Sequence, residues 1–242
     1  RQHMQAGPVQ CTEERTEEHH LREDEPRHAP AEKHVDAVAV ETAFRLADGL
    51  REPLLEHHQP PHQAQRHGVR PPLGAVDPLA ITRRCFEFVR DEIQHSPDAE
   101  RNPVTCTASE VLLAGTGFCY AKSHLLAALL RANAIPAGLC YQRLSLDDTR
   151  PSYCLHGLNA AWLPGYGWYR MDARGNKMGV DAQFCPPVEK LAFGLKAVGE
   201  RDFVEVLPAP LPTVIAALRK FTDWADLSRN LPDWDRPTLS QL

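Results

Sequence analysis

The stretch GTGFCYAKSHLLAALLRANAIPAG, residues 115–138, decides the fold. Leucines recur in it at helical spacing, and Ala121, Ala127 and Ala128 are strong helix formers. Pro136 cannot continue a helix. The pattern therefore predicts a helix over residues 119–133, with Cys119 in its first turn and residues 115–117 as a flexible lead-in.

The position of Cys119 at a helix start favours the ionised, reactive form of its thiol. The helix macrodipole and the unpaired N–H groups of a first turn favour negative charge, which lowers a thiol pKa and produces the reactive thiolate. The same N–H groups, that of Cys119 included, can bind the oxyanion of an acyl-transfer intermediate. A buried structural cysteine in a core helix is the alternative, and this stretch alone leaves it open.

A hairpin downstream carries two possible partners for the thiol. Residues 153–163 and 166–173 are rich in aromatic and apolar residues and flank a Pro-Gly turn. If the hairpin is centred on Pro164, His156 and Asp172 lie opposite each other, with Cβ atoms roughly 4.5–5.5 Å apart. A carboxylate there can orient an imidazole and fix its tautomer. A one-residue slip would break this alignment, and a structural histidine and a turn-forming aspartate remain the alternatives.

The segments before the cysteine also predict helices. Asp77 followed by Pro78 is typical of a helix start, with the aspartate as N-cap and the proline in the first turn. Residues 79–93 then show apolar side chains at helical spacing. Thr107 and Glu110 have the spacing of a capping box and predict a second, short helix.

Beyond the cysteine helix the pattern predicts a further strand before the hairpin and a further helix near the C-terminus. Residues 137–146 read as a strand that leads toward the hairpin. Near the C-terminus, apolar spacing predicts a helix from about Pro212. Trp224 and Trp234 are expected to pack onto the domain.

The composition divides the chain into unlike parts. Residues 1–77 are crowded with charged residues, Gln, Pro and His, and nine of the twelve histidines precede position 68. Such a segment has too little apolar surface to offset its ordering entropy, so we expect it to be disordered or not native coding sequence. Metal binding by the histidines is the sharper alternative. We expect a catalytic domain over residues 78–232 and a tail over 233–242.

The bulk composition excludes several classes of protein. The net charge of -5 and the pI near 6.2 give no sign of a nucleic-acid partner. No apolar run is long enough for a membrane span, and no secretory leader is visible, although the chain starts at Arg1. The seven cysteines form no C-x-x-C pair. We therefore expect a cytoplasmic protein with mostly free thiols and with no metal or cofactor.

The three segments together resemble the transglutaminase-like superfamily. The cysteine helix is carried by GFCYAKSHLLAALLRANAIPA, the histidine strand by LHGLNAAWL and the aspartate strand by GWYRMDARGNK. The resemblance covers roughly residues 78–210 and is nearest to compact bacterial members described as cysteine proteases. It implies an α+β, papain-like fold in which N-terminal helices and a cysteine at a helix start pack on an antiparallel sheet. It assigns Cys119 as nucleophile, His156 as general base and acid, and Asp172 as the orienting carboxylate.

Further residues are weaker candidates for the site. The family places a second oxyanion donor upstream of the cysteine, for which Asn102 and Thr105 are guesses. Other candidates for lining the cleft, each with packing or turn chemistry as its alternative, are Tyr120, Asn159, Arg174 and Asn176. His124 and Cys154 are expected to be structural.

The resemblance implies thiol-dependent acyl transfer on a peptide or amide substrate. Hydrolysis is the expected outcome, because water competes successfully unless an amine is specifically bound. Transamidation of protein glutamine is an alternative, which the lack of a calcium-loop pattern weakens. A binding module without catalysis is another, because one fold hosts many functions. The oligomeric state does not follow from the sequence.

Overall fold

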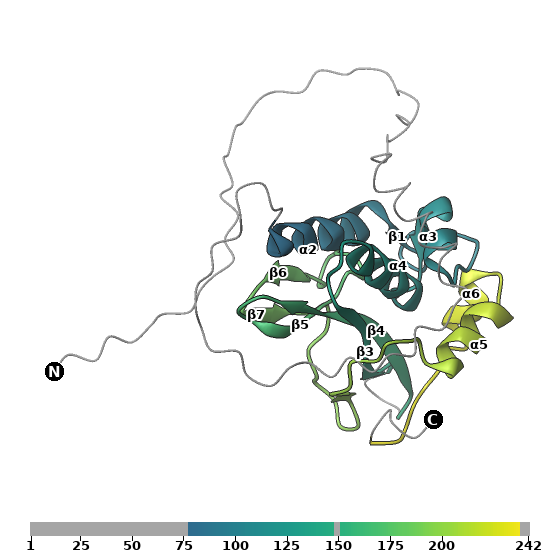
Figure 1. The fold of residues 1–242 in the computed structure, drawn as a ribbon. Helices are drawn as coiled ribbons and strands as arrows, with labels where there is room; N and C mark the ends of the chain where they lie inside the picture. Colours follow the sequence, from purple (N-terminus) through teal and green to yellow (C-terminus); the bar gives the residue numbers. More distant parts are fainter. Residues whose placement is uncertain (1–76, 148–150, 238–242) are drawn as a thin grey trace, which may run out of the picture. The chain divides into compact units, whose positions relative to one another are not determined.

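The computed structural model describes residues 77–147 and 151–237 (Figure 1). The predictions made for residues 1–76 lie outside the described residues. The helices are α2 (Pro78–Glu87), η1 (a π-helical turn, Phe88–Glu92), α3 (Ala108–Ala114), α4 (Cys119–Ala132), α5 (Pro212–Lys220) and α6 (Trp224–Ser228). The strands are β1 (Gln94–His95), β2 (Thr116–Gly117), β3 (Ala137–Ser145), β4 (Tyr153–Leu163), β5 (Gly167–Met171), β6 (Gln183–Cys185), β7 (Val188–Lys190) and β8 (Arg201–Asp202).

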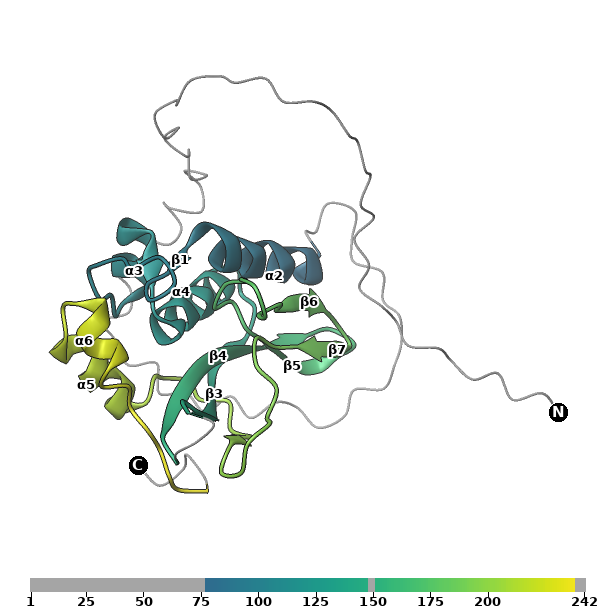
Figure 2. The same cartoon turned by 180° about the vertical axis from the view of Figure 1, so that it is seen from behind.

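The predicted α+β architecture is confirmed. Four antiparallel strands form the main sheet in the order β5-β4-β3-β8. Helix α4 packs against β3 and β4, and α2 and α3 pack against α4, so the helices gather on one side of this sheet (Figures 1 and 2). Within the described residues, no helix is both long and apolar enough to span a membrane.

The predicted helix starts are confirmed by their caps. Asp77 accepts a hydrogen bond from Leu79 N at 3.0 Å and caps α2. The capping box of α3 has both of its bonds, because Thr107 Oγ1 accepts from Glu110 N while Glu110 accepts from Thr107 N. Helix α4 begins at Cys119, as the sequence predicts. Local rules suffice at these positions because cap and helix are neighbours in the sequence.

The flexible lead-in expected at residues 115–117 is wrong. Gly115 ends α3 in the left-handed region, with φ of 62°. The next two residues form β2, which pairs in parallel with β1. Thr116 is buried, and its hydroxyl donates to Gln94 O at 3.1 Å. A strand of two residues carries no periodicity, so the sequence pattern could not reveal it.

The register predicted for the β4–β5 hairpin is also wrong. The observed pairs include Leu163 with Gly167 and Asn159 with Met171, which centre the hairpin on Gly165. Gly165 has φ of 83°, in the left-handed region that favours glycine. Asp172 therefore lies just beyond β5. Because the error moves each partner by two residues, every side chain keeps its predicted face of the sheet.

The C-terminal part also packs on the domain. Helix α5 begins at Pro212, as predicted, and Trp224 and Trp234 contact the core. Asp233 pairs with Arg143 of β3 at 2.7 Å. The described packing therefore continues past residue 232, where the sequence suggested that a tail begins.

Gly157 lies where β4 closely approaches the start of α4. A Cβ at this glycine would meet Tyr120 Cα at 3.1 Å and Tyr120 N at 3.3 Å, both backbone atoms. We expect Gly157→Ala to lower the free energy of unfolding by about 1–3 kcal/mol, because neither element can move away freely. Urea unfolding measures this change. Gly194→Ala is the control, because no heavy atom lies within 4 Å of its Cβ position; equal stability of both variants would contradict the close approach.

Candidate active site

Cys119 is the first residue of α4 and is 9% exposed. The preceding residue, Phe118, has extended backbone angles, and no side chain caps the helix. The N–H groups of the first turn are therefore left without the partner that a capping side chain would provide. The thiol and these donors share one end of the helix, as the sequence suggested.

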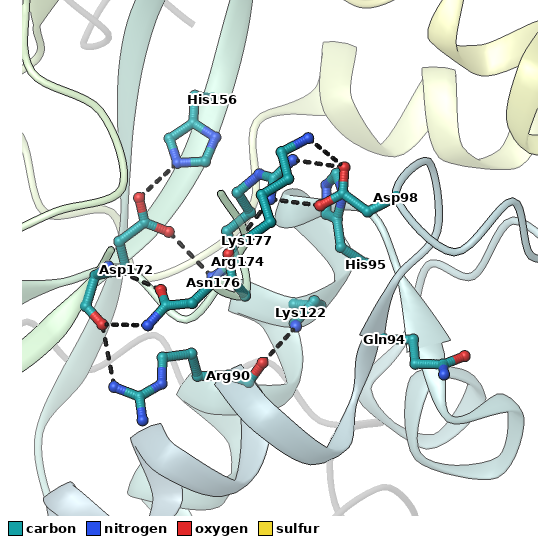
Figure 3. A network of polar contacts seen from close by, with 12 residues as sticks. Arg90, Gln94, His95, Asp98, Lys122, His156, Asp172, Arg174, Asn176 and Lys177 are labelled. Atoms are coloured by element: carbon teal, nitrogen blue, oxygen red, sulfur yellow. Dashed lines mark hydrogen bonds and ion pairs between the residues drawn. The ribbon is translucent and has the colours of Figure 1, made fainter. Parts of the chain in front are cut away.

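His156 and Asp172 form a buried pair. Nε2 of His156 lies 2.7 Å from Oδ2 of Asp172 (Figure 3). The carboxylate also accepts backbone N–H bonds from Arg174 and Ala192, each at 3.1 Å. Burial raises the pKa of Asp172, but His156 and the two N–H donors outweigh it and hold the pKa below its ordinary value.

Electrostatic interactions of this pair also shift the pKa of the Cys119 thiol. Burial lowers the pKa of His156, but the negative groups of Asp172 and Cys119 raise it to about 10. Burial raises the pKa of Cys119, but His156 and a second histidine, His95, lower it to about 6. Both directions favour a thiolate beside an imidazolium at neutral pH. Since Nε2 of His156 faces Asp172, Nδ1 is the ring nitrogen left for the thiol.

A cleft of about 500 Å³ opens at these residues. Cys119 and His156 line it, and Phe193 presses edge-on against the imidazole with ring centroids 5.0 Å apart. Leucines and basic side chains complete the walls. The walls are thus apolar close to the thiol, with cations among them, and the cleft is large enough for a side chain and its neighbouring peptide groups.

Among the cleft residues that the sequence pattern does not indicate are a histidine and an aspartate, His95 and Asp98. Nδ1 of His95 lies 3.3 Å from Oδ2 of Asp98. Asp98 also binds Arg174, at 2.6 and 3.0 Å, and Lys177 Nζ at 2.7 Å (Figure 3). The only signal in the sequence is a histidine three residues before an aspartate in a polar turn. What brings them to the cleft is the β1–β2 pairing, which the sequence does not predict.

Lys122, one turn after Cys119, is a buried lysine that the sequence pattern does not indicate either. Its Nζ donates to the carbonyl oxygens of Ile93 at 2.5 Å and Arg90 at 3.3 Å. Burial and, to a smaller extent, the nearby charge of Arg174 lower its pKa to about 7. These bonds tie α4 to the end of η1, next to the strand that carries His95.

Two of the weaker candidates line the cleft. Tyr120 is buried, and its hydroxyl donates to the carbonyl oxygen of Leu155 on β4. Arg174 links the two carboxylates of the site, because its backbone N–H binds Asp172 and its guanidinium binds Asp98. Both residues thus hold parts of the cleft in place.

The two guesses for an oxyanion donor do not line the cleft. The amide of Asn102 donates to Asp223 at 2.7 Å and accepts from Trp224 N at 2.8 Å, at the start of α6. Thr105 is buried, and its hydroxyl donates to Thr116 O at 3.0 Å. Both residues serve local structure, because their polar groups bind loop backbone and a helix cap.

Asn159 and Asn176 likewise lie outside the cleft lining. Asn159 is fully buried and donates to Ser123 O at 2.9 Å and Gly138 O at 3.3 Å, which ties α4 to the sheet. Asn176 exchanges two hydrogen bonds with the backbone of Ala182 and closes a loop. Backbone groups therefore take up the amide donors that the sequence suggested for substrate.

His124 and Cys154 also have defined places. His124 lies on the other face of α4, where Nδ1 is 2.7 Å from Cys106 O, and it lines a separate apolar cavity of about 370 Å³. Cys154 is buried on β4 and lines the cleft near Cys119. Burial raises the pKa of Cys154 to about 12, so this thiol stays protonated where Cys119 ionises.

Lys122 makes stability depend on pH in a predictable direction. Its pKa falls from 10.5 when unfolded to about 7 when folded, so the unfolded chain binds more protons between these values. Stability from this group therefore rises with pH across that window, by up to about 1.4 kcal/mol per pH unit. We expect the stability difference between wild type and Lys122→Met to change in favour of wild type from pH 7 to pH 9.5 in urea unfolding. A stability difference that stays the same from pH 7 to pH 9.5 would contradict burial of the lysine.

Comparisons with solved structures give distant neighbours. A candidate cysteine protease from Cytophaga hutchinsonii is 23% identical with a TM-score of 0.29, over 40% of this chain and 30% of that one. The periplasmic domain of TgpA from Pseudomonas aeruginosa is 21% identical with a TM-score of 0.33, over 60% of this chain and 44% of that one. This chain thus covers less than half the length of either protein.

A comparison with the curated proteins finds no match. The model of the Transglutaminase-like superfamily, in contrast, matches residues 70–173. The matched segment contains Cys119, His156 and Asp172, the residues on which the resemblance was based. Residues 70–173 of the chain are therefore similar to the transglutaminase-like superfamily.

Proposed function

We propose that this protein is a thiol-dependent acyl-transfer enzyme in which Cys119, His156 and Asp172 act as nucleophile, acid–base and orienting carboxylate. The observation that carries the proposal is a buried thiol at an uncapped helix start, beside a histidine that a buried carboxylate holds at 2.7 Å. This combination generates a nucleophile, a proton carrier and an oxyanion site together.

Acylation follows from these positions. The thiolate of Cys119 attacks the carbonyl carbon of an amide, and the backbone N–H of Cys119 donates to the oxyanion. When the C–N bond breaks, the imidazolium of His156 gives its Nδ1 proton to the leaving amine. An acyl thioester on Cys119 and a neutral His156 remain, while Asp172 keeps its charge and its bond to Nε2.

Hydrolysis of the thioester completes the cycle. Neutral His156 takes a proton from water, and the oxygen attacks the thioester carbon. The C–S bond breaks, which releases a carboxylic acid and restores the thiolate–imidazolium pair. The net reaction is amide plus water to acid plus amine.

The charges of the cleft favour water over an amine as acceptor. Two carboxylates are found among the described residues that line it, those of Asp98 and Glu200. Asp98 binds basic side chains, and Glu200 accepts backbone N–H bonds from Lys196 and Ala197. A cationic amine would therefore have to compete for carboxylates that already have partners.

The nucleophile assignment is tested with Cys119→Ala. We expect its amide-cleaving activity to fall at least about 1000-fold, because the covalent route is lost. Release of amine from a mixture of peptide and glutamine-amide substrates measures the activity, and mass spectrometry in H₂¹⁸O with an added primary amine identifies the product. Cys185→Ala, a thiol outside the cleft lining, is the control and should keep full activity.

Three results would change the proposal. Full activity in Cys119→Ala would remove Cys119 as the nucleophile. A product that carries the added amine instead of ¹⁸O would replace hydrolysis with transamidation. A wild-type protein that binds peptides but cleaves none would leave a binding module on this fold.

A further inference from the structure

The face of α4 turned away from the nucleophile lines a second cavity, of about 370 Å³. The helix contributes four residues at positions i, i+3, i+4 and i+7, which form one stripe along its surface: His124, Ala127, Ala128 and Arg131. Residues 208–210 and helix α5 supply further walls. A cavity of this volume is within the range of small-molecule sites, and the proposed acyl transfer uses none of its residues.

The histidine of this cavity has a ring nitrogen without a partner. Nδ1 of His124 lies 2.7 Å from the carbonyl oxygen of Cys106. A carbonyl only accepts, so Nδ1 carries the ring hydrogen and Nε2 keeps a bare lone pair. Burial outweighs the Cys106 bond and lowers the pKa of His124, so the ring stays neutral at pH 7. Nε2 is buried, and no donor among the described residues binds it.

The bare nitrogen indicates what kind of group belongs in the cavity. Buried polar atoms of native proteins are almost always hydrogen-bonded, to protein, water or ligand. The ring of His124 lines the cavity and the described part of the chain supplies no donor, so the donor has to belong to a molecule inside the cavity. Most of the lining is alanine, proline, leucine and isoleucine, which favours a donor group on an apolar body.

The other end of the stripe carries a positive charge that no carboxylate balances. Arg131 donates to the carbonyl oxygen of Ala137 at 3.0 and 2.8 Å and to that of Pro208 at 2.8 Å, which are neutral acceptors. Among the described residues no acidic side chain pairs with it, whereas Arg219, the other charged residue of the lining, binds Glu110 at 2.7 Å. The cavity therefore lacks an anion beside Arg131.

The spacing of the two groups limits the shape of the ligand. Seven residues separate His124 from Arg131, which is about 10 Å along the helix axis at 1.5 Å per residue. Between them, Ala127 and Ala128 have no side-chain atoms beyond Cβ and leave room for a ring. A molecule that meets both groups has a hydrogen-bond donor at one end, an anion at the other and a flat apolar body between them.

We propose that this cavity binds a small aromatic acid, whose hydroxyl donates to Nε2 of His124 and whose carboxylate pairs with Arg131. The lining shares no residue with the cleft that holds Cys119, so this binding is independent of the proposed acyl transfer.

Calorimetric titration of the full chain with 3-(4-hydroxyphenyl)propionate tests the site at pH 7. We expect saturable binding with a Kd below about 1 mM. 3-Phenylpropionate lacks the hydroxyl and should bind about tenfold more weakly, because Nε2 is again left without a donor. Tyramine keeps the phenol but carries an ammonium group in place of the carboxylate. It should bind at least about 100-fold more weakly, because a charge-assisted bond is replaced by repulsion from Arg131.

Four variants place the binding in this cavity. His124→Asn keeps an amide N–H near Nδ1 for Cys106 but has no atom at Nε2, so it should lose the preference for the hydroxylated acid. Arg131→Gln removes the charge and should weaken binding of the acid at least about tenfold. Ala128→Leu fills the space for the ring and should abolish binding. Lys220→Gln, which removes a charge on α5 outside the lining, is the control and should leave the Kd unchanged.

The comparison of ligands on the wild type and the variants decides between the outcomes. Absence of saturable binding up to about 10 mM would overturn the site. Undiminished binding in folded Ala128→Leu, as judged by circular dichroism, would place the acid elsewhere on the protein. Equal affinity of wild type for 3-(4-hydroxyphenyl)propionate and 3-phenylpropionate would assign Nε2 to water and overturn the recognition of a hydroxyl, and this comparison needs no variant to fold.

Discussion

The arrangement depends on the bond between the imidazole of His156 and the carboxylate of Asp172. A fully buried carboxylate is costly unless charge and hydrogen bonds compensate it. Asp172 is fully buried and accepts one bond from the imidazole and two from backbone N–H groups. Those three donors come from β4 and from loops on either side of β6 and β7, so the carboxylate holds together segments that are far apart in sequence.

A chain of polar contacts extends from this bond around the thiol. Asp172 binds the backbone N–H of Arg174, whose guanidinium binds Asp98, which in turn faces His95. The two histidines therefore belong to one network (Figure 3), and both line the cleft with Cys119. Buried polar networks are stable only when their members are satisfied. Loss of one member should therefore leave its buried partner unsatisfied and disturb both the packing of these segments and the chemistry of the thiol.

The sequence predicts the parts of this site that depend on local rules. The helix start at Cys119 and the capping box at Thr107 are confirmed, and the face of the sheet that carries His156 follows from alternation. The hairpin register is wrong by two residues, because the turn centres on Gly165 rather than Pro164. The network around His95 was missed because two-residue strands and a buried lysine leave no periodic signal.

The most direct test of the account is the rate of Cys119 alkylation by iodoacetamide against pH, in wild type and His156→Ala. The account predicts a wild-type plateau that extends down to about pH 6, where the pKa of the thiol lies, and a midpoint moved toward higher pH in the variant. A single titration near the ordinary thiol value, about pH 8.5, unchanged by the substitution, would contradict a thiolate–imidazolium pair.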